Sequence, residues 1–148
     1  WLTLFRDKID EIMEQVKCPV AVFVNRQYRE GSAVSFVLGG MIDLFLFSYL
    51  DKMLQNGHSV RLFLFDTDDE EFRGHIDDLQ VRYPEQTMIV WFAGVEDLVT
   101  EEKDGLLIMS HLSYTKLSED EAVMRELSSL LVIRRNKNTG DKNEGLEN

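Results

Sequence analysis

The chain has 148 residues, enough for one domain with a sizeable core, and its apolar (44%) and charged (29%) fractions are ordinary for a globular protein. Its net charge of −11 argues against a nucleic-acid partner and against docking on an anionic membrane surface, because both need clustered Lys and Arg. The single cysteine, Cys18, excludes an internal disulfide and favours a reducing compartment.

The first predicted elements are an amphipathic helix over residues 2–16 and a short apolar strand at Val20–Val24. Pro19 ends the helix, since the residue before a proline avoids the α region. A helix followed by a strand usually closes an α/β unit, yet here the pair precedes a complete second unit. Because the sequence also starts at Trp1, we interpret residues 1–26 as the terminal helix and strand of a preceding domain in a longer protein.

Residues 27–134 alternate between strand and helix patterns after a polar linker. Apolar runs predict strands at 33–38, 60–65, 87–92, 106–110 and 131–133. Helices are expected over 41–55, after the acidic run 66–71, within 95–102, and after a capping box at Ser118–Glu121. This alternation predicts an α/β fold with a doubly wound, mostly parallel five-stranded sheet, to which Val20–Val24 adds an edge strand. Residues 135–148 are polar and without periodicity, which predicts a disordered tail.

The apolar stretch Ala33–Leu50 has the length of a membrane span. Gly39-Gly40 interrupts the stretch and Asp43 lies near its middle, where a charge is costly in a bilayer. A buried strand, a glycine turn and a buried helix are therefore predicted in place of a span.

Two segments carry a family resemblance. Val16–Arg26 (VKCPVAVFVNR) resembles the junction between the two cytosolic halves of monovalent cation:proton antiporters, where an A-P-C-S-V-x-I-L-V-D-R-G-like stretch ends a first universal-stress-like domain. Here Cys18 and Pro19 stand in the opposite order, Asn25 replaces the Asp, and Arg26 matches.

The second segment is the remainder of the domain. A hydrophobic strand that ends in Gly39-Gly40, a long helix, and Leu106–Leu117 (LLIMSHLSYTKL) before a capped helix are similar to the second such domain of the bacterial antiporters. The resemblance covers about residues 10–134. It implies a universal-stress-protein-like fold with strand order 3-2-1-4-5, in which the last strands of the two halves pair antiparallel. That pairing would place Val20–Val24 beside Leu131–Ile133.

The resemblance also implies a function: a cytosolic regulatory and assembly domain of a bacterial Na⁺/H⁺ or K⁺/H⁺ antiporter, with no catalysis and no cofactor of its own. Its partners would be the membrane transport domain and the preceding cytosolic domain of the same chain. We further expect a homodimer, and a location on the cytoplasmic side of the inner membrane, with this fragment itself soluble. A cytosolic domain of a cation–chloride cotransporter is an open alternative.

A nucleotide site is the second alternative, since universal stress proteins often bind ATP through a glycine-rich turn after the fourth strand. The corresponding loop here, Ser110–Leu117, contains no glycine, so its side chains would crowd a phosphate. The weak candidates for a nucleotide-binding universal-stress-type protein are Gly39, Gly40, Asp66, Ser110 and His111.

Other chemistry has little support in the sequence. The three histidines lie in no metal-binding spacing, so no metal site is predicted. His111 with Ser110, Ser113 and Tyr114 resembles a catalytic set, but a G-x-S-x-G motif is absent and we predict no enzyme. His111 as a pH sensor and Cys18 as a redox sensor are hypotheses that rest on position alone.

Overall fold

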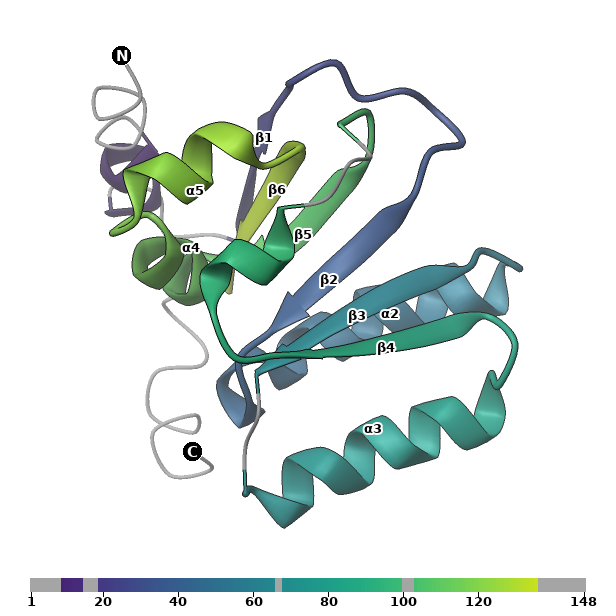
Figure 1. Cartoon of the computed structure of the whole chain (residues 1–148). Helices are drawn as coiled ribbons and strands as arrows, with labels where there is room; N and C mark the ends of the chain where they lie inside the picture. Colours follow the sequence, from purple (N-terminus) through teal and green to yellow (C-terminus); the bar gives the residue numbers. More distant parts are fainter. Residues whose placement is uncertain (1–8, 15–18, 66–67, 100–102, 136–148) are drawn as a thin grey trace.

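The computed structural model describes residues 9–14, 19–65, 68–99 and 103–135. Six strands form one sheet in the order β1-β6-β5-β2-β3-β4 (Figure 1). Their bounds are β1 Val20–Val24, β2 Val34–Leu38, β3 Val60–Phe65, β4 Thr87–Phe92, β5 Leu106–Ser110 and β6 Ser129–Arg134. Every neighbouring pair is parallel except β1 and β6. The predicted α/β class with a mostly parallel sheet is confirmed.

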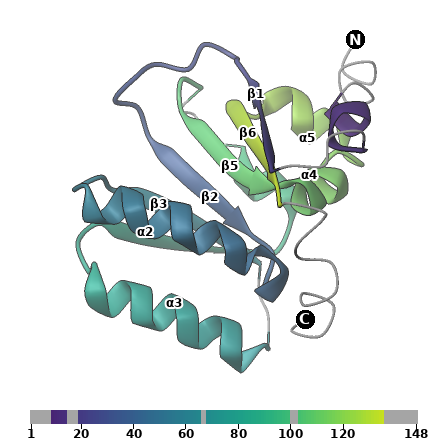
Figure 2. The same cartoon turned by 180° about the vertical axis from the view of Figure 1, so that it is seen from behind.

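One face of the sheet is covered by two helices, α2 (Phe47–Gln55) and α3 (Glu70–Arg82), as seen from behind in Figure 2. Leu50 and Leu54 of α2 and Phe72 and Ile76 of α3 are buried against alternate residues of β2 and β3. Central strands covered on both faces need apolar residues at successive positions, which explains the run Leu62–Phe65 in β3.

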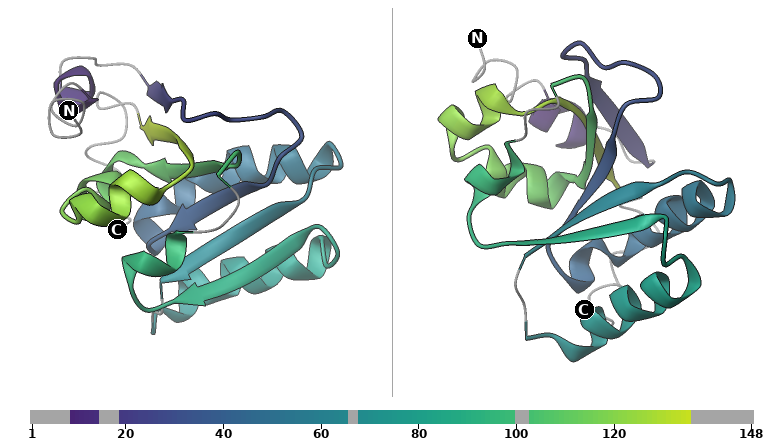
Figure 3. Two further views of the ribbon diagram at one scale, coloured as in Figure 1. Left: turned by 45° about the horizontal axis from the view of Figure 1, so that its top comes forward. Right: turned by 45° about the vertical axis from the view of Figure 1, so that its right-hand side comes forward.

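The opposite face is covered over β1, β6 and β5 by three short helical pieces: residues 9–14, α4 (His111–Leu117) and α5 (Glu121–Glu126). Ile9 and Met13 are fully buried in this second core. Towards β4, the described part of this face carries the single 3₁₀ turn η2 (Val95–Leu98), within the range where a short helix is expected. Figure 3 shows this uneven cover, which leaves Met88 of β4 64% exposed.

The N-terminal segment is built into this sheet. β1 pairs with β6 antiparallel over five residues, from Val20 opposite Arg134 to Val24 opposite Leu130. Two residues after β1, the Arg26 backbone N–H donates to Ser129 Oγ at 2.7 Å. The antiparallel edge strand from the N-terminal segment is therefore present, whereas the division of the chain into domains at residue 26 stays a prediction.

Three local expectations were wrong. The helix predicted over 41–55 is divided into a 3₁₀ helix η1 (Met41–Leu46) and α2, and the Asp43 carboxylate turns back to the Gly39 N–H within that tight first turn. The N-cap of α5 is Asp120, which accepts from Val123 N, and not the predicted Ser118, whose Oγ donates to Thr115 O at the end of α4.

The third error concerns residues 110–117, which were expected to form a loop and instead form α4 behind the cap residue Ser110. The stretch Ala33–Leu50 is a strand, a turn and helical segments, as predicted. Among the described residues, no helix is both long enough and apolar enough to cross a membrane. Most of the tail expected to be disordered, and Cys18, lie outside the described residues.

Candidate functional site

The candidate site lies where β2 and β5 run side by side. They are parallel neighbours, with Phe36 opposite Ile108, but the chain leaves β2 towards β3 and leaves β5 towards β6 on the other side. Ligands of open α/β sheets bind outside the carboxyl ends of the strands at such a switch in direction. Gly39-Gly40 follow β2 at this point, and Ser110 and His111 stand at the end of β5.

Asp43 joins the two strand ends. Its side chain is fully buried, and its Oδ2 accepts hydrogen bonds from the Gly39 N–H at 2.6 Å and from Ser113 Oγ at 3.1 Å. The second carboxylate oxygen, Oδ1, is buried without a hydrogen-bond partner among the described residues. One carboxylate thus holds the turn after β2 and the first turn of α4 together.

The remaining polar groups at this point are also occupied. Ser110 Oγ accepts from the Ser113 N–H at 3.1 Å and caps α4, and both serines are buried. Gly40 has a φ of +133°, a conformation that favours glycine, so it serves the turn. A Cβ on Gly39 would lie 3.3 Å from Asp43 Oδ2, so the carboxylate fills the space above the end of β2.

His111 takes part in a separate contact. Its Nε2 lies 2.9 Å from Asp10 Oδ1, which ties α4 to the helical residues 9–14. Ser113 Oγ donates to Asp43, so its hydroxyl is directed to a carboxylate and not to an imidazole. The structure therefore connects Gly39 and Ser110 through Asp43 and Ser113. His111 follows Ser110 but makes its contact with Asp10. Asp66 lies outside the described residues.

Asp43, Ser113 and Asp10 are the residues whose partners sequence reasoning missed. The available signal was an acidic residue three positions after a glycine pair inside an otherwise apolar run, which we interpreted only as evidence against a membrane span.

The chemistry of this arrangement does not favour an anion. A phosphate needs backbone N–H groups that converge on it. Here the Gly39 N–H is taken by Asp43 and the Ser113 N–H by Ser110, and the Asp43 carboxylate would face the phosphate. Within the described residues there is also no group of three or more His, Cys, Asp or Glu that could hold a metal ion.

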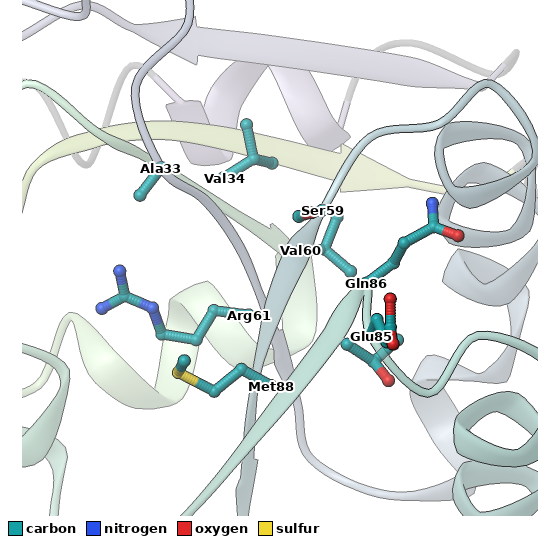
Figure 4. A pocket seen from close by; sticks show the side chains of 9 residues that line it. Ala33, Val34, Ser59, Val60, Arg61, Glu85, Gln86 and Met88 are labelled. Atoms are coloured by element: carbon teal, nitrogen blue, oxygen red, sulfur yellow. The ribbon is translucent and has the colours of Figure 1, made fainter.

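A separate hollow of about 290 Å³ lies at the opposite, amino ends of β2, β3 and β4 (Figure 4). It is open to solvent, and Arg61 and Met88 lie beside each other within it. The other residues that line it are Ala33, Val34, Ser59, Val60, Glu85, Gln86 and Thr87.

Comparison of the chain with protein-family models, with curated proteins and with solved structures gives no match.

Proposed function

We propose that this chain is a cytosolic regulatory and assembly domain of a membrane cation:proton antiporter, with no catalysis of its own. The observation that carries the proposal is the antiparallel pairing of β1 with β6. The segment that resembles the end of a first cytosolic half, Val16–Arg26, supplies β1, and the resemblance implies this pairing with the last strand of the second half. The sheet order β4-β3-β2-β5-β6 also reads 3-2-1-4-5 when the strands after β1 are numbered along the chain, which supports a universal-stress-protein-like fold.

In this proposal the partners are the preceding cytosolic domain and the transport domain of the same chain, and the assembly is a homodimer at the cytoplasmic side of the inner membrane. Regulation would act by population shift, because a contact that differs between two transporter states changes their relative populations.

The occupied donors at the switch point favour this role over nucleotide binding. Asp43 accepts hydrogen bonds from both the Gly39 N–H and Ser113 Oγ, so these donors are not available to a ligand at the ends of β2 and β5. Such an arrangement is expected of a scaffold. Calorimetric titration of ATP, ADP and AMP, with and without Mg²⁺, distinguishes the regulatory role from nucleotide binding. Micromolar binding would favour the nucleotide-binding alternative.

The decisive experiment uses the native gene product that contains this chain. We expect it to sediment with membranes and to restore Na⁺/H⁺ or K⁺/H⁺ exchange in everted vesicles from a bacterial strain without its own antiporters. Val22→Pro, which removes a donor from the middle of β1, should alter the regulation of exchange, while Glu30→Ala in the exposed linker should not. Chloride-dependent movement of the cation together with chloride would favour the cotransporter alternative, and a gene product found only in the supernatant would contradict the proposal.

A further inference from the structure

The β4 strand forms one edge of the sheet and consists of uncharged, mostly apolar residues. Its six residues, Thr87–Phe92 (TMIVWF), contain no charge and no proline. Natural edge strands are commonly blunted with lysine, proline or a bulge, since an unblocked edge is a template for another strand. Met88 is 64% and Trp91 44% exposed, although both belong to this apolar strand.

The two faces of β4 differ in what covers them. Met88, Val90 and Phe92 alternate onto the face with the sparse cover, where Val90 and Phe92 contact the core below η2. Ile89 and Trp91 point to the other face, where the Arg73 guanidinium of α3 lies 4.6 Å from the Trp91 ring centroid. An added strand would therefore cover apolar side chains on both faces.

We propose that β4 pairs antiparallel with β4 of a second copy of this chain, with the two-fold axis at Val90. This inference rests on the proposed function and deepens it, because it assigns a surface to the homodimer. A two-fold axis perpendicular to the sheet leaves the corresponding faces of the two copies on the same side. Because the axis passes by Val90, Val90 of one copy lies opposite Val90 of the other. Met88 then lies opposite Phe92, and Ile89 opposite Trp91, and every cross-strand pair is apolar.

Charge and topology favour a second copy over a foreign strand. The chain carries a net charge of −11, so two copies repel each other overall, and β4, which is uncharged throughout, is a surface where this repulsion is least. On α3, Arg73 and Asp77 stand one turn apart, so two antiparallel α3 helices about the same axis can oppose unlike charges. The other sheet edge, β1, comes from the segment that the proposed function assigns to the preceding domain. Because the β4 contact uses the same surface on both copies, it closes as a dimer and does not continue as a fibre.

The test measures the mass of the full chain by light scattering over a wide concentration range. We expect a dimer whose dissociation constant rises about tenfold or more in Met88→Lys, since lysine is a common guard of edge strands. Leu112→Lys on α4 and Phe23→Lys on β1 are matched controls, because both native side chains are 48% exposed apolar residues away from β4. Both controls should leave the dimer intact, and circular dichroism checks that each variant is folded.

Cysteine cross-linking tests the register. In a Cys18→Ser background, Val90→Cys should form an intermolecular disulfide under copper-phenanthroline oxidation, since paired Cα atoms lie about 4.5–5.5 Å apart across antiparallel strands. Met88→Cys should not, because the two Met88 Cα atoms would be roughly 13 Å apart. A monomer at all concentrations overturns the inference, as does a dimer that resists Met88→Lys but dissociates in Phe23→Lys. Failure of the proposed function would appear separately, as a β4 dimer whose parent protein carries out no exchange.

Discussion

Ser113 Oγ donates a 3.1 Å hydrogen bond to Asp43 Oδ2 across 70 positions of sequence, and this bond joins the two sides of the switch point. Asp43 reaches it from the first turn after β2, while Ser113 reaches it from the first turn of α4. The same oxygen also accepts from the Gly39 N–H, so a single buried carboxylate fixes both strand ends. The ends of β2 and β5 therefore act as one unit.

Asp43→Ala should destabilise the chain more than any other acidic-to-alanine change away from a cap. It leaves the Gly39 N–H and Ser113 Oγ buried without their acceptor, which costs about 2–3 kcal/mol of unfolding free energy. Asp43→Asn keeps an acceptor oxygen and should lose less. Urea denaturation measures the difference, and the exposed Glu30→Ala is the control, expected within about 0.5 kcal/mol of the parent. Equal stability of Asp43→Ala and Glu30→Ala would show that the bridge contributes nothing.

Gly39→Ala should destabilise through contact and not through backbone strain. The added Cβ would lie 3.3 Å from Asp43 Oδ2 and 3.5 Å from Ser113 Oγ, so the bridge must shift. We expect a loss of about 1 kcal/mol that becomes smaller in the Asp43→Ala background, with a coupling of about 0.5–1 kcal/mol in the double-mutant cycle.

Gly74→Ala is the matched control for this substitution. Gly74 lies inside α3 with open space around its Cβ position, so alanine should stabilise the helix by about 0.5–1 kcal/mol. Additive effects of Gly39→Ala and Asp43→Ala would contradict the contact explanation.

The strands were predictable from the sequence because their signal is local. An apolar run such as Leu62–Phe65 within β3 has few places in a globular fold other than a strand covered on both faces. The helix caps were less predictable, since Ser118 and Asp120 are both good cap residues two positions apart and tertiary packing selects between them.

The bridge between Asp43 and Ser113 could not be predicted from the sequence, for a different reason. The Asp43 to Ser113 bond depends on which strands become neighbours, and no local pattern records that. By contrast, α4 had a local signal that we did not use: Ser110 stands three positions before Ser113, the spacing at which a serine side chain caps a backbone N–H.

Arg26→Ala should loosen the N-terminal segment from α5. The Arg26 Nη1 donates to the carbonyl oxygens of Met124 and Leu127 at the end of that helix, where a cation is also favoured by the helix dipole. Loss of this donor should cost about 1.5–3 kcal/mol, and Arg26→Lys should recover part of it. The exposed Arg29→Ala, which removes a 3.8 Å ion pair with Asp104, is the control and should cost at most about 0.5 kcal/mol.

The Arg26 contribution should not vary with pH in the working range. Burial lowers the pKa of the Arg26 guanidinium, so the folded state disfavours the charged form relative to the unfolded state. That penalty would be relieved only as the pH rises through the folded-state pKa, and arginine stays charged between about pH 5 and pH 9. Urea curves for the parent and Arg26→Ala should therefore differ by a constant amount over this interval, and a difference that changes with pH would implicate another group.

The His111 to Asp10 contact should hold the helical residues 9–14 on α4. Because Asp10 is 41% exposed on its side chain, solvent screens the pair, and a double-mutant cycle of His111→Ala and Asp10→Ala should give a coupling of about 0.5 kcal/mol. The coupling should fall in high salt if the imidazole is charged and persist if the bond is neutral. Hydrogen exchange provides the local readout: amides in residues 9–14 should exchange faster in His111→Ala, while those of β3 keep the parent rate. His58→Ala, at an exposed position after α2, is the control, and equal exchange rates in both histidine variants would show that burial of Ile9 and Met13 alone holds the segment.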